Sequence, residues 1–329
     1  MPMNRMKQSV NRMNNIADLI GNAKNVAITG HIRPDGDCVG SCMGLYNYLK
    51  ENFRNIAPDV YLEKPGNEFD FIANTDNIRY EAEAKIYDLF IVLDCSDLDR
   101  IEPFKSMYDS ARSTLCIDHH ISNTRYADVN VVDGDASSTC EVLYRLLDKN
   151  LVSKTVAEAI YTGIIHDTGV FKYSSTSVNT MQAAGELMSK GIDFTSIIDN
   201  SFYKKTYVQN QILGRVLLES VLFYGGKCIF SSVTKADMDF YHVTGKDLGG
   251  IIEQLRLTDG VEVAIFLYEL SPSEYKVSLR SKKIVDVSKI AVKYGGGGHI
   301  RAAGCTMYGT VHDIINNLGE QIEYQLEKA

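Results

Sequence analysis

The chain has 329 residues, of which 45% are hydrophobic and 23% are charged. That length favours two domains over one, and the composition is that of a well-packed globular protein rather than a disordered one. The formal net charge of −8 argues against general attraction to nucleic acid polymers, because proteins that grip long strands usually present a basic face. If the chain handles phosphates, it must use a few placed cations or bound metals.

The cysteines and the N-terminus bear on cellular location. Seven cysteines are scattered without a C-x-x-C pair, which is typical of reduced intracellular thiols rather than of a disulfide framework. Residues 1–20 lack the apolar core of a secretory signal, and no apolar run approaches the roughly twenty residues that span a bilayer. We therefore expect a cytoplasmic protein with no membrane partner.

Short apolar runs alternate with helical patterns in the first half of the chain. The run Leu89–Leu93 is continuously apolar, as is typical of a strand buried on both faces. Strands that alternate with helices predict an α/β domain with a doubly wound parallel sheet. Gly40 and Gly44, four residues apart, should let the first helix lie close to this sheet. The predicted strands are 26–29, 89–93 and 115–117, and the predicted helices are 42–53, 138–149, 155–165 and 179–190.

The second half has a different pattern, with strand-like runs followed by a helix and a run of four glycines. These elements predict a smaller α/β domain at the C-terminus. We place the first domain at 1–190, a linker at 191–213 and the second domain at 214–329. The predicted elements are strands at 227–233, 261–268 and 275–280, a helix at 286–294 and a glycine loop at 295–298.

Carboxylate and imidazole side chains gather at four places in the first half, three of them directly after a predicted strand. A lone Asp after a strand is usually a turn residue or a helix cap. In an open parallel sheet, however, ligands bind beyond the carboxyl ends of the strands, so these groups should converge on one edge. The groups are His31, Asp35 and Asp37; Asp94; Asp118, His119 and His120; and His166 with Asp167.

The carboxylates of Asp35, Asp37, Asp94 and Asp167 bring four negative charges into one crevice. These charges repel one another unless cations neutralise them. Two divalent cations supply the matching charge, and neutral His31 and His119 add ligand atoms without more charge. Oxygen ligands with some imidazole suit Mn²⁺ or Mg²⁺. Two such ions about 3.5–4 Å apart can activate a bridging water and stabilise a phosphoryl transition state. On these residues alone, a single-metal or non-phosphate hydrolase remains open.

The order of these motifs resembles the DHH phosphoesterase superfamily, and the match covers nearly the whole chain. In the first half, the resemblance rests on the motifs Gly30-His31-x-x-Pro34-Asp35-x-Asp37, Leu93-Asp94, Asp118-His119-His120 and Asp167. In the second half, the segment around Arg280 and the run Gly295–Gly298 before His299 resemble the accompanying DHHA1 domain. Size and domain composition are most similar to the branch of oligoribonucleases (nanoRNases) that are also pAp phosphatases. This resemblance implies hydrolysis of very short oligoribonucleotides and of pAp, in a cleft between the two domains.

The resemblance also implies a role for each residue of the first domain. His31 and Asp35 would hold one metal, with Mn²⁺ preferred and Mg²⁺ as the alternative. Asp37, His119 and Asp167 would hold the other metal, and Asp94 would bridge the two ions. His120 would be catalytic and face the scissile phosphate, while Asp118 would orient the histidine pair. Cys38, where the family usually has a small residue, is interpreted as packing, and the role of His166 is undecided.

In the second domain the resemblance implies a site for the other phosphate of the substrate. Arg280 and His299 would bind that phosphate, with help from Arg301. The backbone N–H groups of Gly296, Gly297 and Gly298 would approach it closely. The expected partners are short oligoribonucleotides, dinucleotides or pAp, with no long duplex nucleic acid, and a homodimer is compatible with the sequence.

Several other functions fit parts of the pattern. A phosphodiesterase of linear or cyclic dinucleotides, such as pApA, pGpG or c-di-AMP, would use the same catalytic groups. A manganese pyrophosphatase would carry a different C-terminal domain, and a long-strand DNA exonuclease would need a more basic surface. A non-catalytic nucleotide-binding module would have lost metal ligands, yet all six candidates are present. The residue pattern therefore favours an enzyme.

Overall fold

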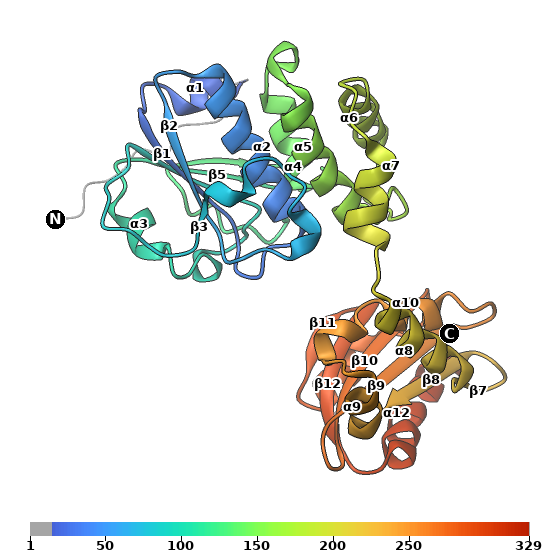
Figure 1. Ribbon diagram of the computed structural model, residues 1–329. Coiled ribbons are helices and arrows are strands. Elements are labelled where there is room, and N and C mark those ends of the chain that lie inside the picture. Colours follow the sequence, from blue (N-terminus) through green and yellow to red (C-terminus); the bar gives the residue numbers. More distant parts are fainter. Residues whose placement is uncertain (1–14, 329) are drawn as a thin grey trace. The chain divides into compact units, whose positions relative to one another are not determined.

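The computed structural model of the protein describes residues 15–328 (Figure 1). The chain divides into two compact units, Met1–Lys204 and Lys205–Ala329. Residues 1–14, which belong to the stretch expected to lack a secretory signal, lie outside the described residues. Within the described part, no helix combines the length and the apolar character that crossing a membrane requires. All seven cysteines are buried and free.

The first unit is built on a six-stranded sheet in which every pair of neighbouring strands is parallel. The strand order is β3-β2-β1-β4-β5-β6, so the chain reverses its direction of winding between β1 and β4. Ligands of such sheets bind at this reversal, beyond the carboxyl ends of the strands. The strands are β1 (Asn25–Thr29), β2 (Ala57–Tyr61), β3 (Ile78–Arg79), β4 (Leu89–Leu93), β5 (Thr114–Asp118) and β6 (Val129–Val132).

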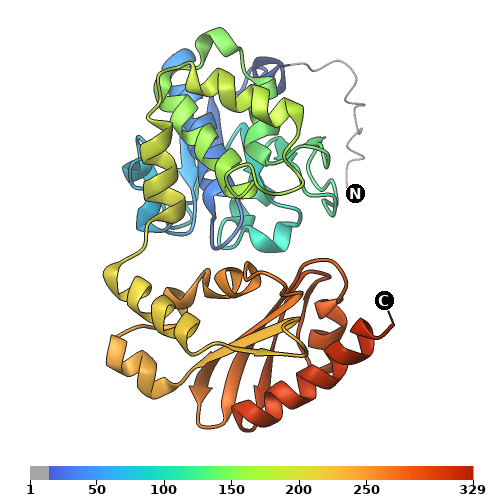
Figure 2. The same ribbon diagram turned by 90° about the vertical axis from the view of Figure 1, so that its right-hand side faces the viewer.

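Helices cover both faces of this sheet, as predicted for a doubly wound fold (Figures 1 and 2). One face packs on α2 and α4, while α5 packs against these two helices and α6 packs against α5. The other face is covered by the shorter α3 and by aromatic side chains around Tyr87 and Phe90. The helices are α1 (Ile16–Ile20), α2 (Gly36–Asn52), α3 (Lys105–Ser110), α4 (Thr139–Leu146), α5 (Lys154–Asp167), α6 (Val178–Met188) and α7 (Phe194–Ile197). Short helical turns include η1 (Asn67–Phe69) and the π-helix η5 (Ile198–Tyr203).

Helix α2 differs from its prediction in two ways. It begins at Gly36 rather than at residue 42, because the Asp35 side chain accepts hydrogen bonds from the first turn and caps the helix there. The prediction that Gly40 and Gly44 let the helix lie close to the sheet is wrong, because both glycines face another helix. A Cβ atom at Gly40 would lie 2.5 Å from the carbonyl oxygen of Ala159, and one at Gly44 would lie 2.8 Å from Ile160, both on α5. The glycines therefore let α2 and α5 approach closely.

The second unit contains a mixed six-stranded sheet in the order β11-β12-β10-β9-β8-β7. Only β8 and β9 run parallel, and the other pairs are antiparallel. The predicted glycine loop is partly wrong, because its second half forms the edge strand β11. The strands are β7 (Val221–Phe223), β8 (Cys228–Val233), β9 (Val263–Ser271), β10 (Glu274–Ser281), β11 (Gly297–His299) and β12 (Ala302–Tyr308).

Helices also cover both faces of the second sheet, each over its own apolar cluster. Helices α11 and α12 pack on one face, and α8, α9 and α10 pack on the other. Residues 191–213, predicted as a linker, are mostly helical and include α7, η5 and the first half of α8. The helices are α8 (Tyr207–Leu218), α9 (Lys235–Tyr241), α10 (Ile251–Arg256), α11 (Val287–Lys293) and α12 (Val311–Leu326).

Candidate metal centre

The fold brings the acidic and imidazole groups of the first unit together at the carboxyl ends of three neighbouring strands. His31 follows β1, Asp94 follows β4, and Asp118 ends β5 just before His119. Because β1, β4 and β5 are adjacent in the sheet, these side chains meet at its reversal point. Helix ends supply the remaining carboxylates: Asp35 and Asp37 at the start of α2, and Asp167 at the end of α5.

These side chains form two groups that share Asp94. In the first group, His31 Nε2 lies 3.4 Å from Asp94 Oδ2 and 3.6 Å from Asp35 Oδ2. In the second group, His119 Nε2 lies 3.7 Å from Asp94 Oδ1, the other oxygen of the same carboxylate. The same nitrogen is 3.1 Å from Asp167 Oδ2 and 3.9 Å from Asp37 Oδ2. Asp94 therefore presents one oxygen to each group.

The buried carboxylates are held in place by the N-terminus of α4. The backbone N–H groups of Thr139 and Cys140 donate to the two oxygens of Asp37, at 2.6 and 2.9 Å. The Thr139 hydroxyl donates to Asp94 Oδ1 at 3.0 Å. Ser138 caps the helix by accepting a hydrogen bond from the backbone N–H of Glu141. The roles of Thr139 toward Asp37 and Asp94 were missed, since these contacts span 102 and 45 residues of sequence.

The ring of His31 is oriented as a metal ligand would require. Its Nδ1 lies 2.8 Å from the carbonyl oxygen of Ile32, which can only accept, so Nδ1 carries the hydrogen. In the neutral ring Nε2 is then left with a free lone pair, and this atom faces Asp35 and Asp94. The arrangement fits a divalent cation, because one nitrogen and several carboxylate oxygens point to the same place.

The ionisation of the site reflects its excess of negative charge. Burial, with Asp94 and Asp167 nearby, raises the pKa of Asp37 well above its usual range. Burial opposes the charged form of His31, but contacts with Asp35 and Asp94 outweigh it and raise the pKa of His31 to about 11. In the same way, burial is outweighed at His119 by Asp167 and Asp37, and its pKa rises to about 10. In the absence of cations, protons on the histidines thus compensate the carboxylates, and divalent cations could replace those protons.

Asp118 is fully buried and orients the two histidines that follow it. Its Oδ1 accepts from the backbone N–H of His119 at 2.9 Å and from Nδ1 of His120 at 2.7 Å. Its Oδ2 accepts from Asn123 at 2.6 Å, a contact that was not foreseen. The hydrogen bond to Asp118 raises the pKa of His120. His120 is therefore a donor with a fixed ring, and a third of its side chain remains exposed.

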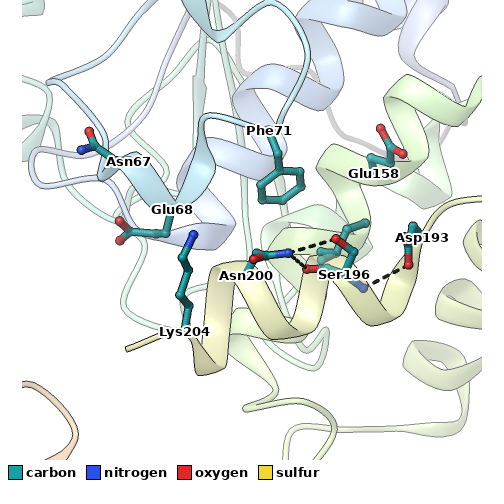
Figure 3. A pocket seen from close by; sticks show the side chains of 9 residues that line it. Asn67, Glu68, Phe71, Glu158, Asp193, Ser196, Asn200 and Lys204 are labelled. Atoms are coloured by element: carbon teal, nitrogen blue, oxygen red, sulfur yellow. Dashed lines mark hydrogen bonds between the residues drawn. The ribbon is translucent and has the colours of Figure 1, made fainter. Parts of the chain in front are cut away.

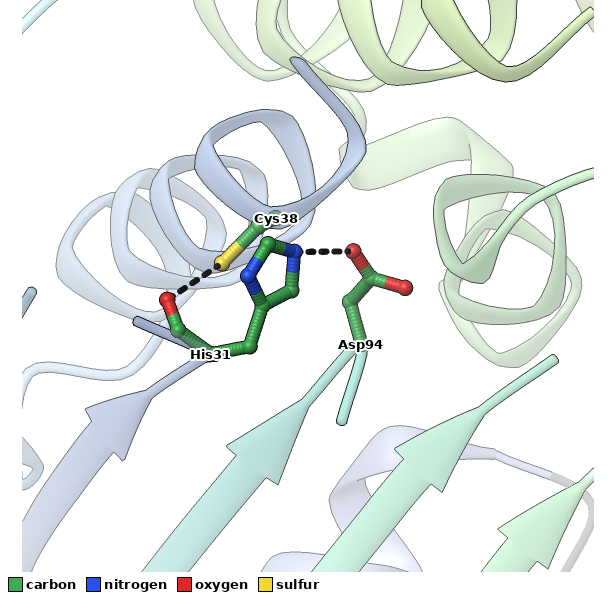
Figure 4. A group of neighbouring side chains, drawn as sticks. All are labelled: His31, Cys38 and Asp94. Atoms are coloured by element: carbon green, nitrogen blue, oxygen red, sulfur yellow. Dashed lines mark hydrogen bonds and ion pairs between the residues drawn. The ribbon is translucent and has the colours of Figure 1, made fainter. Parts of the chain in front are cut away.

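The thiol of Cys38 lies behind His31 (Figure 4). Its Sγ contacts the carbonyl oxygen of His31 at 3.9 Å, and the side chain is fully buried. The sulfur is within 4.8 Å of ligand atoms of His31 and Asp94. Burial raises the pKa of the Cys38 thiol well above its usual value, which favours the protonated form expected of a packing residue.

The helix that carries Asp167 runs two residues further than predicted, so His166 and Asp167 form its last turn. The ring of His166 is packed between Phe69 and Phe202, with centroid distances of 5.2 and 5.4 Å. Its Nε2 lies 3.2 Å from the hydroxyl oxygen of Ser201. Burial lowers the pKa of His166 to about 4 against the opposing influence of Asp35, so the ring is neutral at physiological pH.

In the second unit, the predicted phosphate-binding residues lie in one row across three strands. Arg280 on β10 is paired with Ala302 on β12, and Ala302 is paired with His299 on β11. Paired residues of antiparallel strands share a face of the sheet, so Arg280 and His299 flank the small Ala302. Arg280 Nε donates to Glu253 at 2.8 Å, which fixes one edge of the guanidinium group.

The glycines before His299 allow β11 to lie against β12. A Cβ atom at Gly296 would be 2.2 Å from the carbonyl oxygen of Gly304, and Gly298 has a φ of 143° and a similar clash. The far edge of β11 has no partner strand in the described sheet. The backbone N–H of Gly296, which was predicted to approach a phosphate, instead donates to the carbonyl oxygen of Ala291 at 2.9 Å. Arg301 instead uses its guanidinium group to bind the carbonyl oxygens of Val285 and Lys283.

Comparison with known proteins gives two family matches. Residues 25–164 match the DHH family, N-terminal domain, and residues 225–327 match the DHHA1 domain. Together the two matches cover most of the chain. DHH phosphoesterases use divalent metals, which agrees with the clusters of acidic and imidazole groups in the first unit.

Individual proteins are similar over nearly the full length. The bifunctional oligoribonuclease and PAP phosphatase NrnA of Thermus thermophilus is 29% identical, over 92% of this chain and 91% of that protein. The protein of the same name from Bacillus subtilis is 29% identical, over 84% and 88%. A crystal structure of an exopolyphosphatase-related protein from Bacteroides fragilis superposes with a TM-score of 0.81 at 25% identity, covering 92% of this chain and 93% of that one.

Proposed function

Because the chain belongs to the DHH/DHHA1 phosphoesterase superfamily, we propose that it is a dinuclear-metal hydrolase of very short oligoribonucleotides and of pAp. It releases mononucleotides from the former and AMP from the latter. The names of the relatives from Thermus thermophilus and Bacillus subtilis, oligoribonuclease and PAP phosphatase, support both substrates. The free cysteines support a cytoplasmic location.

The observation that carries this proposal is the position of Asp94. One of its oxygens faces His31 and Asp35, and the other faces the group around His119. A carboxylate with an oxygen toward each of two ligand groups suits a bridge between two cations, as in two-metal hydrolases. In this assignment His31 and Asp35 would hold one cation, Asp37, His119 and Asp167 would hold the second, and Asp94 would offer one oxygen to each.

The ligand set favours Mn²⁺, with Mg²⁺ as the alternative. Mg²⁺ prefers oxygen ligands and keeps several waters, whereas Mn²⁺ also accepts imidazole. Each of the two ligand groups contains one histidine, His31 or His119. When bound, the divalent cations supply the positive charge that activates a water for attack on phosphorus and stabilises the phosphoryl transition state.

The residues of the chain itself orient the substrate and handle the proton. His120 has its Nδ1 bound to Asp118, which leaves Nε2 free to donate to the scissile phosphate or to the leaving oxygen. Asp118 does not contact the substrate in this assignment. It holds the imidazole in one tautomer and favours its protonated form, because the hydrogen bond from His120 raises the pKa of that ring.

The second unit selects for short substrates in this proposal. Arg280 and His299 bind a second phosphate of the substrate, and Arg suits this role because its planar group can hold two phosphate oxygens. The free edge of β11 adds backbone N–H groups. The net charge of −8 does not favour a long polymer, so we infer a preference for about two to five nucleotides.

A second candidate is hydrolysis within a cyclic-dinucleotide pathway. The cyclic-di-AMP phosphodiesterase PdeA of Listeria monocytogenes is 27% identical over 88% of this chain, although the match covers only 45% of that larger protein. The catalytic groups would be the same, and only the preferred substrate would differ.

A turnover assay with Mn²⁺ separates these candidates. The substrates are pAp, pApA, pGpG, cyclic di-AMP, pyrophosphate, a ribonucleotide trimer and a single strand of about 24 nucleotides, chosen because length preference is the property in question. The proposal expects hydrolysis of pAp and the trimer, and little of the long strand or of pyrophosphate. Hydrolysis of the dinucleotides alone would favour the second candidate, and turnover of pyrophosphate alone would reject both.

A further inference from the structure

His166 is the one histidine near the metal centre to which the proposed function gives no role. It lies on α5 immediately before Asp167, and its ring faces the turn that carries Asp35 and Asp37. A Cβ atom at Gly36, between these two aspartates, would lie 2.2 Å from Cγ of His166. The imidazole therefore packs directly on the backbone of this turn, and only glycine leaves room for it.

The other side of the ring is held by η5. Ser201 donates its single hydroxyl proton to the carbonyl oxygen of Ile197, at 2.7 Å. Its oxygen can then only accept from His166, so Nε2 of His166 carries a hydrogen and donates it at 3.2 Å. Phe202 of η5 packs edge-on to the same ring, and Phe69 of η1 tilts against it. Two neighbouring residues of η5 thus contact His166.

The segment η5 has two features of a movable element. It is a π-helix, a rare form that is frequent at functional sites, and it ends at Tyr203, next to the boundary at Lys204 where the first unit ends. A hollow of about 420 Å³ lies beside the segment formed by α7 and η5 (Figure 3). It is lined by Asn67, Glu68 and Phe71 on one side and by Ser196, Asn200 and Lys204 on the other. Asp199, Asn200 and Tyr203 of η5 are exposed, so one side of η5 faces solvent while Ser201 is buried against His166.

We propose that His166 is a positioning residue that couples η5, the segment leading out of the first unit, to the metal-binding turn at Asp35–Asp37. When η5 is seated on His166, the ring supports this turn and the last turn of α5, which carries Asp167. When η5 moves away, the His166 ring loses its contacts with Ser201 and Phe202. The metal-binding turn and the last turn of α5 can then move apart. The affinity of the centre for its cations then depends on the seating of η5. This inference rests on the metal ligands assigned under the proposed function.

The test measures the dissociation constant for Mn²⁺ of the full-length chain, from the electron paramagnetic resonance signal of free Mn²⁺. His166→Ala should weaken Mn²⁺ binding about tenfold, the lower end of the effect of residues that support metal ligands. Ser201→Ala removes only the hydroxyl and should weaken it about 2- to 10-fold, the range for one hydrogen bond. His166→Gln, whose amide can still donate to Ser201, should recover most of the loss.

Kinetics give a second readout that a purely structural role would not change. Each weakened variant should lose kcat at limiting Mn²⁺, regain it in excess Mn²⁺, and keep its KM for substrate. Two controls should bind Mn²⁺ like the wild type: His312→Ala, at an exposed histidine of the second unit, and Leu187→Ala, at a buried residue of α6. The second control removes a buried side chain from the core of the first unit on α6 rather than on α5 or η5, so it separates lost stability from lost coupling.

The outcomes separate a wrong assignment of the metal centre from a wrong assignment of the coupling. If the wild-type protein binds no Mn²⁺, the assigned metal centre is wrong and the proposed function fails with it. If the wild type binds Mn²⁺ and folded His166→Ala binds it equally well, the coupling alone is wrong. If His166→Ala does not fold, Ser201→Ala decides, and wild-type affinity in that variant overturns the link to η5.

Discussion

The two candidate sites of this chain, one in each unit, differ in how firmly the fold holds their side chains. In the first unit, Asp37 and Asp94 are 0% and 2% exposed, and each accepts hydrogen bonds from α4, far away in sequence. In the second unit, His299 lies on an exposed edge strand, and its side chain makes no hydrogen bond among residues 15–328.

The difference follows from the charge that each site must handle. Carboxylates gathered at one place repel one another, so the fold must hold them with buried donors before any cation arrives. In a phosphate site built from Arg280 and His299, Arg280 is partly exposed and His299 is exposed, so solvent screens the charge of such a site. The metal centre should therefore be sensitive to small changes in geometry, while the phosphate site should respond mainly to loss of a contact.

The strongest test of this contrast is Asp94→Asn. The amide keeps the shape of the side chain but removes one charge and one of the two oxygens that face the ligand groups. Turnover should fall by at least about 10⁴-fold, the range for loss of a single essential group, while the circular dichroism spectrum stays unchanged. A folded variant with wild-type rates would rule out Asp94 as the bridge.

The next largest loss of turnover is expected when His120 is replaced. His120→Ala should lower kcat by about 10²- to 10⁴-fold, as for a positioned proton donor. Both cations should remain bound, because His120 contacts Asp118 rather than completing a ligand group in our assignment. Elemental analysis of the purified variant checks this division of roles, and loss of one ion per chain would move His120 into the ligand set.

In the second unit, Arg280→Ala should raise KM for a dinucleotide about 10- to 100-fold, the equivalent of one charged hydrogen bond, and leave kcat nearly unchanged. A small phosphodiester that lacks the second phosphate should be affected much less. Arg256→Ala is a matched control, because Arg256 pairs with the same Glu253 at 2.8 Å but lies outside the row with His299. Equal losses with both phosphodiesters would place Arg280 at the metal centre instead.

The smallest effect should come from a residue that only supports a ligand. Thr139→Val keeps the shape of the side chain but removes the hydroxyl that donates to Asp94. We expect about a tenfold loss of Mn²⁺ affinity, as is usual for a hydrogen-bonding partner of a ligand. Thr162→Val is the control, since that buried hydroxyl donates to the backbone of Glu158. Identical Mn²⁺ affinities in the two variants would show that the hydrogen bond from Thr139 to Asp94 does not contribute to metal binding.

Local patterns in the sequence predicted the central elements closely. The strand at 89–93 is confirmed at both ends, and the strand predicted at 26–29 begins one residue earlier. Leu89–Leu93 is a continuous apolar run, and residues 26–29 are apolar except for Thr29, as is typical of central parallel strands. The weak strand β2 was missed because Ala57–Tyr61 contains Pro58 and Asp59 and is only partly buried. Its place in the sheet comes from pairing with β1 rather than from its own pattern.

The sequence by itself also determined which residues gather at the candidate metal centre, because side chains at the carboxyl ends of neighbouring parallel strands lie close together. Only the tertiary structure decided how they are held. That Asp94 turns one oxygen toward each ligand group depends on Thr139, 45 residues away. That Gly40 faces α5, and that His166 packs on Gly36, depend on the close approach of α2 and α5. The local periodicity of apolar residues predicts which side of a helix or strand is buried. Which other element packs against that side depends on the packing of the whole unit.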